Sequence, residues 1–534
     1  MSRQMAVHGV VVLGILLSGC GVATAPPPVA STHDGENRSR GPAPGDCAGM
    51  LALSLDDVVV TSAAVVPADP DSGLPEYCDV VGTIHGTVVF DVRLPTGGWN
   101  RKLWFGGNMG FAGHIRRDTS AGLSRGYATV STDTGHTVQN PDLDNLDGSW
   151  ALNDVPAEID FGYRAVHEST VVGKQVVRAF YGRAANRAYF DGCSNGGRQA
   201  LQEAARYPDD YDGIAAGAPV LDETGLMTGY VWDMQAQHAT EDSSDVPLEK
   251  LPLIGNAVLA GCDALDGLTD GLIDDPRKCH FDPGTLLCTG PDGPDCLTAT
   301  QVQALRAIYA GPSTSEGEQL YPGFLPGGET PDASFNGWDV WLVSSDDLGP
   351  SLQFILMDQF LRYLAFRPDR PDFDFHTFDF DHSPQQMRAI AQLLNPSSDL
   401  SAYRRSGGKL LMYQGWSDAS QSALRTVEYF REVKHASHHH GGDFARLFMV
   451  PGMFHCGGGP GPNDFDYLGA LEAWVEQGHA PESMIATHFS DDTGQPDRTR
   501  PLCPYPEVAR YVGAGDIDDA VSFRCVRPHD PEDE

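Results

Sequence analysis

A pentapeptide, Gly192-Cys193-Ser194-Asn195-Gly196, constrains the fold of this chain more than any other segment. It matches G-x-S-x-G, the sharp turn between a strand and a helix that lifts a serine hydroxyl above the end of a parallel sheet. The motif alone is a weak signal in a glycine-rich chain. Here an apolar segment at 187–190 precedes it, and a helical pattern from Gly197 to Arg206 follows it. The context therefore predicts a strand, a turn and a helix, with Ser194 at the turn.

The alternation of strands and helices continues on both sides of this turn and predicts a parallel sheet covered by helices. It stops near Val220 and resumes near Lys409, after a stretch rich in Pro and Gly. The expected strands lie at 79–95, 102–105, 127–132, 187–190, 214–217, 409–413 and 446–450, and the expected helices at 160–181, 197–206, 423–434 and 464–477.

Asp418 and His455 each follow an expected strand, and with Ser194 they give the chain order Ser, Asp, His that is typical of the α/β-hydrolase fold. A serine hydroxyl needs a neutral imidazole to take its proton, and a carboxylate to orient that imidazole. The sequence therefore predicts Ser194 as nucleophile, His455 as base and Asp418 as the orienting acid. His114 and His136 are alternative bases, whereas His435 and His438 to His440 are expected in an exposed loop.

These positions predict an α/β-hydrolase core with a large inserted lid domain. The core is expected to comprise 47–219 and 402–534, and the lid 220–401. Backbone N–H groups must stabilise the oxyanion that forms during acyl transfer. Asn195 is expected to supply one, and the glycine-rich segment with Asn108 and Met109 the other; the alternative for that segment is a simple turn.

The N-terminus has the composition of an export signal. Residues 1–19 contain one arginine and a short apolar stretch, and Leu17-Ser18-Gly19-Cys20 resembles the bacterial lipobox. We expect a lipoprotein signal peptide at 1–19, lipidation of Cys20 and a flexible tether at 20–46. An ordinary cleaved signal is the alternative. Either one predicts an exported protein, and the first predicts one anchored at the cell surface.

Ten cysteines remain once Cys20 is set aside, an even number that suits an exported chain with five disulfides. Spacing suggests the pairs Cys47–Cys78, Cys262–Cys279, Cys288–Cys296 and Cys503–Cys525, which leaves Cys193 and Cys456 for each other. Spacing alone does not determine the pairing, so this set is a hypothesis.

Three aspartates, Asp263, Asp266 and Asp270, alternate with glycines in one short segment. Their carboxylates, with the backbone carbonyls of Leu268 and Leu272, form an oxygen-rich set that suits Ca²⁺. The segment lacks the bidentate Glu of an EF-hand, and a solvated acidic turn is the alternative. We expect one structural calcium ion in the lid.

The formal net charge of −37 excludes nucleic acid as an expected partner, because such a surface repels polyanions. We expect a small ester substrate instead. A membrane is expected to be contacted only through the N-terminal lipid.

The chain resembles the tannase and feruloyl esterase family, which also includes hydrolases of mono(2-hydroxyethyl) terephthalate. The resemblance covers most of the mature chain and is most specific where Cys193 precedes Ser194 and Cys456 follows His455. The other matching segments are 107–113, 195–201, the Asp263 loop, 361–366, 407–410, 415–418 and 452–454.

The resemblance implies that Cys193 is bonded to Cys456 beside the triad, that the lid holds one calcium ion, and that the substrates are esters of aromatic carboxylic acids. Two positions depart from the family. Met109 stands where a glycine is usual, and Gln414 stands where a histidine is often found. The aromatic residues at 354–366 could line the acyl pocket, although at helical spacing they are more often lid core.

The predicted activity is hydrolysis of aromatic esters through an acyl-enzyme. An esterase for aliphatic or polyester-derived substrates is one alternative. A non-catalytic binding protein on a hydrolase scaffold is the other.

Overall fold

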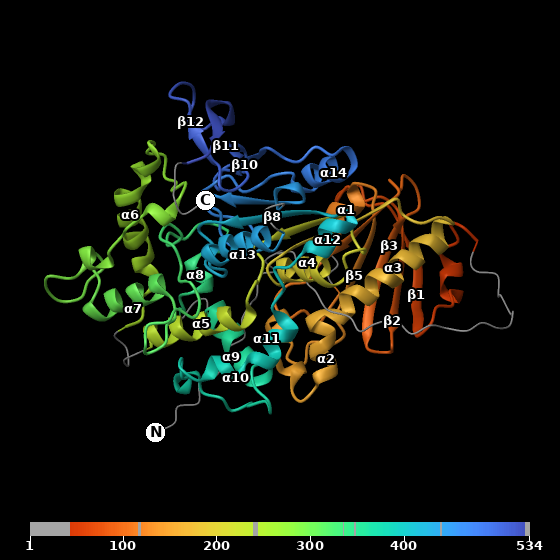
Figure 1. Cartoon of the computed structure of the whole chain (residues 1–534), viewed down its shortest axis with the longest axis horizontal. Coiled ribbons are helices and arrows are strands. Elements are labelled where there is room, and N and C mark those ends of the chain that lie inside the picture. The colour runs from red at the N-terminus through yellow and green to blue at the C-terminus, as the bar shows by residue number, and fades with distance from the viewer. Residues whose placement is uncertain are drawn as a thin grey trace.

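The computed structural model describes residues 43–115, 119–238, 244–334, 336–345, 349–437 and 441–528. A nine-stranded sheet in the order β1-β2-β3-β5-β4-β6-β7-β8-β9 forms its centre (Figure 1). These strands are β1 Val58–Val66, β2 Tyr77–Ile84, β3 Val88–Pro95, β4 Lys102–Gly106, β5 Ala128–Thr132, β6 Arg187–Cys193, β7 Gly213–Gly217, β8 Lys409–Gly415 and β9 Ala445–Val450.

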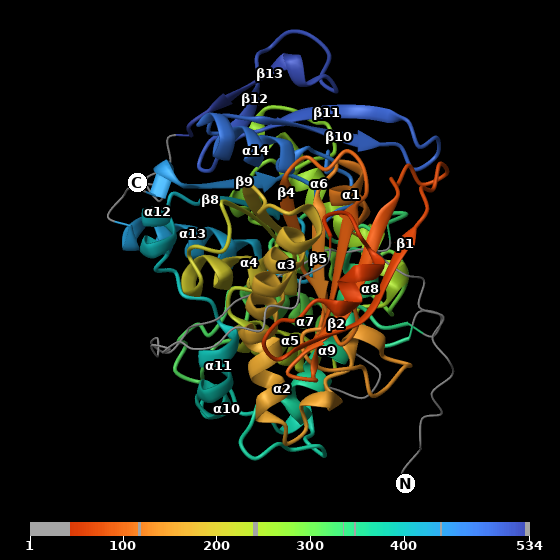
Figure 2. The ribbon, with the colours of Figure 1, turned by 90° about the vertical axis from the view of Figure 1, so that its right-hand side faces the viewer.

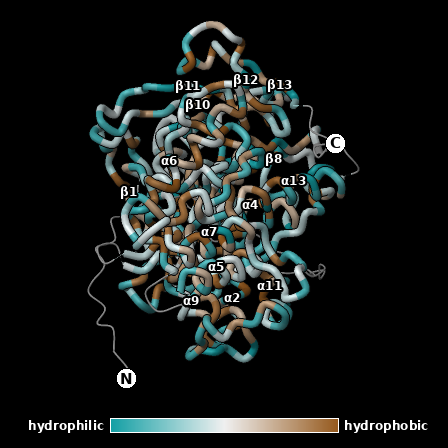
Figure 3. The backbone as a smooth tube through the Cα atoms, turned by 90° about the vertical axis from the view of Figure 1, so that its left-hand side faces the viewer, coloured by the Kyte–Doolittle hydropathy of each residue, from teal (hydrophilic) through white to brown (hydrophobic). Residues whose placement is uncertain are grey.

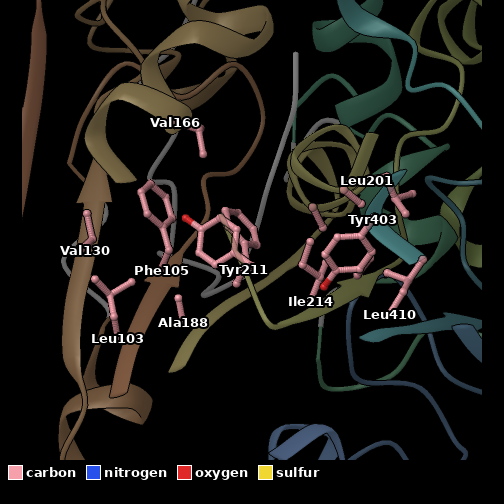
Figure 4. Close-up of a cluster of buried hydrophobic side chains, with 14 of the residues drawn as sticks. Leu103, Phe105, Val130, Val166, Ala188, Leu201, Tyr211, Ile214, Tyr403 and Leu410 are labelled. Carbon is pink, nitrogen blue, oxygen red and sulfur yellow. The ribbon is translucent and has the colours of Figure 1, made fainter. Parts of the chain in front are cut away.

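The sheet is parallel from β5 to β9, whereas β1, β2 and β3 are joined to it and to each other in antiparallel fashion. Because successive side chains of a strand point to opposite faces, the parallel strands supply two hydrophobic layers. Figure 4 shows one of them, in which Leu103, Phe105, Val130, Ala188 and Ile214 meet side chains from covering helices. The opposite layer contains Trp104, Tyr189 and Leu411.

Helices cover both layers. On the first layer lie α3 Ala165–Tyr181, α4 Asn195–Arg206, α12 Ser401–Ser406 and α13 Ala423–Ala436, and on the second lie α1 Ser120–Ser124 and α14 Tyr467–Gln477. A short helix, α2 Val155–Ile159, and a π-helical turn at Asp160–Arg164 lead into α3. The helix expected from Asp160 therefore begins as a regular α-helix at Ala165.

A long insertion separates β7 from β8. Its helices are α5 Glu223–Gln237, α6 Leu251–Cys262, α7 Ala299–Ala310, α8 Trp338–Trp341, α9 Leu352–Tyr363, α10 Ser383–Gln386 and α11 Arg388–Leu394. They share a hydrophobic core that also contains Phe111, Trp150 and Phe161 from the sheet region. In Figures 1 and 2 most of these helices gather beside one end of the sheet.

Two hairpins at the C-terminal end lie outside the main sheet. They are β10 Met484–Phe489 with β11 Pro496–Leu502, and β12 Val508–Tyr511 with β13 Phe523–Val526. Figure 2 places them together above the sheet. Sequence patterns did not indicate them, because β11 has the sequence PDRTRPL and lacks a clear apolar alternation.

Hydrophilic segments follow much of the outline in Figure 3. Among the described residues, no helix is both long and apolar enough to cross a membrane. The expected signal peptide at 1–19, the lipidated Cys20 and most of the tether at 20–46 lie outside the described residues.

Candidate active site

Ser194 occupies the turn between β6 and α4. Its backbone has φ 65° and ψ −131°, a conformation that is uncommon for a residue with a side chain, and its N–H donates to Gly217 O at 3.0 Å. Close packing makes this turn possible. A Cβ atom on Gly197 would lie 2.2 Å from Pro219 Cα, so only glycine fits at position 197 in the first turn of α4. Ser194 is half-buried, at the position where the sequence predicted a nucleophile.

Asp418 lies in the turn after β8 and is buried together with its partners. Its Oδ1 accepts hydrogen bonds from Ser420 N at 2.7 Å and Gln421 N at 2.8 Å. Its Oδ2 accepts from Gln414 Nε2 at 2.8 Å and lies 2.9 Å from His455 Nδ1. Four donors thus surround the carboxylate and fix its orientation, and one of them is the imidazole that the sequence paired with it.

Gln414 completes this network from inside β8. Its Oε1 accepts a hydrogen bond from Thr426 Oγ1 at 3.0 Å, which leaves its amide group directed at Asp418. The side chain at this departure from the family pattern therefore contacts the acid. A glutamine there is neutral and adds no charge beside the carboxylate.

His455 follows β9 and is 1% exposed. Its Nε2 lies 3.7 Å from Cys456 Sγ, and within the described part of the chain it forms no hydrogen bond with Ser194 Oγ. Cys456 is bonded to Cys193, with a Cα–Cα distance of 5.9 Å. The disulfide therefore joins the residue before Ser194 to the residue after His455 and holds the two turns side by side.

The competing histidines do not meet Asp418. His136 is buried against Trp150, its Nε2 lies 2.8 Å from Phe111 O, and burial lowers its pKa to about 3. His114 is half-exposed, 3.5 Å from Asp144. His435, expected in a loop, lies exposed in the last turn of helix α13, and His438 to His440 lie outside the described residues. The geometry thus favours His455 as the base.

The two segments expected to form the oxyanion hole follow the adjacent parallel strands β4 and β6. Asn195 is the first residue of α4, where a backbone N–H has no acceptor within the helix. Asn108 N–H donates to Gln199 Oε1 at 3.2 Å, and Asn108 Nδ2 donates to Thr132 O at 2.7 Å. Gln199, which sequence reasoning missed, therefore accepts the hydrogen bond of the Asn108 N–H. The next backbone N–H along the loop belongs to Met109, which is half-buried.

All five disulfides that the sequence suggested are present. They are Cys47–Cys78, Cys193–Cys456, Cys262–Cys279, Cys288–Cys296 and Cys503–Cys525. The bond between Cys193 and Cys456 spans 263 positions of sequence, whereas the other four span 31 or fewer. It is thus the long-range connection among them.

In the aspartate loop at 263–272, the carboxylates accept hydrogen bonds from backbone N–H groups of the same loop. Asp263 accepts from Asp270 N and Gly271 N, both at 3.1 Å, and Asp266 accepts from Leu268 N at 2.8 Å. Asp270 accepts from Leu272 N at 3.2 Å and forms an ion pair with Arg500 of β11. The five residues named for calcium are therefore brought together, and the carboxylates retain further oxygen lone pairs.

Asp274, which the sequence analysis did not select, adds a fourth carboxyl group beside this loop. Burial and the neighbouring charges of Asp266 and Asp270 raise the pKa of Asp274 to about 8. Burial also raises the pKa of Asp266, with Asp270 and Asp263 contributing. Carboxylates that repel one another in a partly buried, oxygen-rich loop fit a hard divalent cation, because the ion would offset their charge.

Two other groups of metal-ligating side chains occur among the described residues. In the first, Cys288 and Cys296 are bonded to each other and are not thiolates. In the second, His167 and Lys174 already contact Asp210, at 2.6 and 3.1 Å, so its charge is matched. We assign a metal to neither group.

Comparison with known proteins gives one consistent family. A family model described as "Tannase and feruloyl esterase" matches residues 74–526. An uncharacterized esterase of Xanthomonas campestris is 36% identical, over 90% of this chain and 91% of that protein. The mono(2-hydroxyethyl) terephthalate hydrolase of Piscinibacter sakaiensis is 35% identical, over 91% of this chain and 90% of its own length.

Solved structures agree with the sequence relatives. The crystal structure of feruloyl esterase B from Aspergillus oryzae has a TM-score of 0.79 and 27% identity, covering 90% of this chain and 99% of that chain. The likeness therefore covers most of this chain and nearly all of the feruloyl esterase.

Proposed function

This chain belongs to the tannase and feruloyl esterase family and is a carboxylic ester hydrolase, and from that premise we propose that it hydrolyses esters of aromatic carboxylic acids with Ser194, His455 and Asp418 as its catalytic triad. The observation that supports the triad most strongly is the buried His455–Asp418 pair, joined by a disulfide to the nucleophile turn. We further propose that the core has the α/β-hydrolase fold and comprises 47–219 and 402–534, with 220–401 as its lid.

In the proposed mechanism, Nε2 of His455 takes the proton of Ser194 Oγ as the hydroxyl attacks the ester carbonyl. The Nδ1–H of His455 donates to Asp418, which stabilises the imidazolium that forms. The imidazolium then protonates the departing alcohol, and a water molecule activated by the same histidine releases the acid. The four donors around Asp418 keep its carboxylate oriented through both halves of the cycle.

The oxyanion is proposed to be stabilised by the backbone N–H groups of Asn195 and Met109. Asn195 contributes as the first amide of α4, where the helix dipole also favours negative charge. Of the two loop residues put forward, Asn108 is the weaker candidate because its N–H already donates to Gln199. Met109 thus becomes the proposed second donor.

The named relatives support an aromatic acyl group, because they include a mono(2-hydroxyethyl) terephthalate hydrolase and feruloyl esterases. In this chain, Phe111 of the loop after β4 contacts Phe161, and Phe161 contacts Trp150, with ring centroids 6.2 and 5.2 Å apart. All three rings are buried in the core that the insertion shares with the sheet region, so they offer no open surface to a substrate.

A matched pair of substrates tests this proposal. Methyl benzoate and methyl cyclohexanecarboxylate have nearly the same size, but only the first acyl group is planar and aromatic. We expect kcat/KM to be at least about tenfold higher for the benzoate and its hydroxylated relatives, which corresponds to about 1.4 kcal/mol of transition-state binding. Equal values, or a preference for the saturated ring or for linear acyl esters, would contradict the aromatic assignment.

We propose that the aspartate loop binds one Ca²⁺ through Asp263, Asp266 and Asp270 and the carbonyls of Leu268 and Leu272. The ion is proposed to be structural, because it would neutralise the carboxylates of this loop. The Cys262–Cys279 disulfide already closes the same part of the insertion. Asp274 is a further carboxyl group available to it.

Removing the ion is expected to lower the melting temperature by a few degrees and to leave kcat unchanged, because a ligand bound only by the folded state stabilises it. Calorimetry with a calcium chelator, followed by added Ca²⁺ or Mg²⁺, checks this. Asp266→Asn is the matched variant: it removes one repelling carboxylate, so the chelated variant should melt no lower than the chelated wild type and should respond less to Ca²⁺. A wild-type melting temperature that is independent of Ca²⁺ would refute the site.

We propose that the protein is exported and anchored through a lipid on Cys20, on the basis of the N-terminal sequence. Cells fed a labelled fatty acid should incorporate the label into the wild type. The Cys20→Ala variant should remain unlabelled and be released from the membrane fraction. Equal labelling of both proteins would exclude lipidation at this cysteine.

A further inference from the structure

The insertion contacts both turns that carry the acid and the base. On the acid turn, Ser417 Oγ donates to Gly327 O at 2.9 Å, and Gln353 Nε2 donates to Ala419 O at 2.9 Å. On the base turn, Gly459 N donates to Asp332 Oδ2 at 2.6 Å. The insertion is thus hydrogen-bonded directly to the two turns that carry Asp418 and His455.

Asn336 makes the most direct of these contacts. Its side-chain amide donates hydrogen bonds to His455 O and to Gly457 O, the latter at 3.1 Å. These two carbonyls flank Cys456, whose φ of 65° lies in the left-handed region. An amide group has two hydrogens, and here each has a backbone acceptor on the base turn. Asn336 is 4% exposed, so water does not replace these bonds easily.

Trp341, at the end of α8, fixes Asn336 and also touches the base. Its indole N–H donates to Asn336 Oδ1 at 3.0 Å, which sets the direction of the amide group. Its ring lies edge-to-face against the imidazole of His455, with centroids 4.7 Å apart and an interplanar angle of 76°. One tryptophan therefore restrains both the backbone anchor and the ring of the same histidine.

The base turn needs such an anchor because of its sequence. Gly457, Gly458 and Gly459 follow Cys456, and Gly458 and Gly459 have positive φ values of 73° and 88°. Glycine has the largest conformational freedom of all residues, so the order of this turn depends on the contacts it makes. These include the Cys193–Cys456 disulfide and the hydrogen bond from Phe454 N to Gly458 O at 3.1 Å. Asp418 fixes Nδ1 of the imidazole, but the position of Nε2 also depends on where the backbone of His455 lies. A misplacement of about 1 Å between reacting groups can lower a rate about a hundredfold.

We propose that Asn336, oriented by Trp341, is a positioning residue for the base His455, so that the insertion forms part of the catalytic apparatus as well as covering it. The proposal rests on the function proposed above, in which His455 is the base for Ser194. It assigns Asn336 no contact with substrate: the residue acts through the backbone of His455.

The test uses Asn336→Asp, which keeps the shape of the side chain but removes both amide hydrogens. With 4-nitrophenyl acetate, whose acetyl group is too small to depend on the acyl pocket, we expect kcat to fall about 10- to 100-fold. KM should stay within about twofold, because the substrate is not contacted. The rate at which diethyl 4-nitrophenyl phosphate modifies Ser194 should fall by a similar factor.

Two further variants separate positioning from stability. Asn395→Asp is the matched control, because Asn395 Nδ2 also donates within the insertion, to Asp222 Oδ1 at 2.6 Å, and it does not contact the base turn. It should lower the melting temperature and leave kcat within about twofold. Trp341→Phe keeps the ring contact but frees the amide of Asn336, and should lower kcat about 3- to 10-fold. Combined with Asn336→Asp it should cause little additional loss, since both act on one anchor.

The outcomes are distinct. Wild-type kcat and phosphorylation rates in Asn336→Asp, with only a lowered melting temperature, would overturn the positioning role. If that variant does not fold, a wild-type kcat in Trp341→Phe overturns it equally. Failure of the organophosphate to modify Ser194 in the wild type would instead count against the proposed triad, so the two proposals fail separately.

Discussion

Replacing Ser194 by alanine is expected to abolish ester hydrolysis, with kcat falling by about 10⁴-fold or more while the protein stays folded. The magnitude follows from the way a triad acts, because loss of the nucleophile removes the acyl-enzyme route and leaves only the contribution of the oxyanion hole and binding. The half-buried side chain loses one oxygen atom, so packing changes little. Steady-state hydrolysis of methyl benzoate and of a 4-nitrophenyl ester measures the effect.

The matched control for this variant is Ser169→Ala. Ser169 is a fully buried serine of α3, a helix that covers the first hydrophobic layer of the sheet. It has no part in the proposed chemistry. It should retain wild-type kcat. Mass spectrometry after treatment with diethyl 4-nitrophenyl phosphate should find the wild type and Ser169→Ala modified at residue 194, and Ser194→Ala unmodified. A rate within tenfold of wild type in Ser194→Ala would refute the nucleophile.

Removing the Cys193–Cys456 bond, by replacing both residues with alanine, is expected to lower both stability and activity. By the chain-entropy model, a bond that closes a loop of this length stabilises the fold by about 5.6 kcal/mol. Its sequence separation of 263 is much larger than that of the other four disulfides, so its expected contribution to stability is larger as well. We expect kcat to fall about tenfold or more as well, because the bond holds the turn of Ser194 against that of His455.

Cys503→Ala with Cys525→Ala provides the comparison, since this pair spans 22 positions in the C-terminal hairpins. Its loss should cost about 3 kcal/mol by the same model and leave kcat unchanged. Denaturant unfolding and kcat, measured on both double variants below their unfolding transitions, separate the two effects. If the Cys193 and Cys456 variant is destabilised but keeps wild-type kcat, the bond serves stability alone.

Local patterns in the sequence located the parts of the site that follow strand ends. Ser194, Asp418 and His455 each lie within five residues after an apolar segment that forms a strand of the parallel sheet, namely β6, β8 and β9. Because the carboxyl ends of parallel strands share one edge, chain order and strand position were sufficient to bring them together. Helix α4 and the buried strand β7 were predictable for the same reason.

Contacts between distant segments were not predictable in this way. Gln199 is separated from Asn108 by 91 positions, and Asn336 from His455 by 119. Neither Gln199 nor Asn336 lies in a sequence pattern, or beside a residue, that identifies the residue it contacts. Asp274 was missed because its burial and its closeness to Asp266 and Asp270 arise only in the folded protein. There the two neighbouring carboxylates raise the pKa of Asp274. The β10–β13 hairpins contain charges and prolines that obscured their strand character.

The long disulfide also determines an order of events during synthesis. Cys193 leaves the ribosome 263 residues before Cys456, a delay of about 13 to 50 s at ordinary rates of translation. In that interval Cys262, Cys279, Cys288 and Cys296 emerge, and their bonds span only 17 and 8 positions. These short bonds can form as soon as both of their cysteines have reached an oxidising compartment, whereas the thiol next to Ser194 must wait for nearly half the chain. Any early partner it takes has to be exchanged before the two turns can meet.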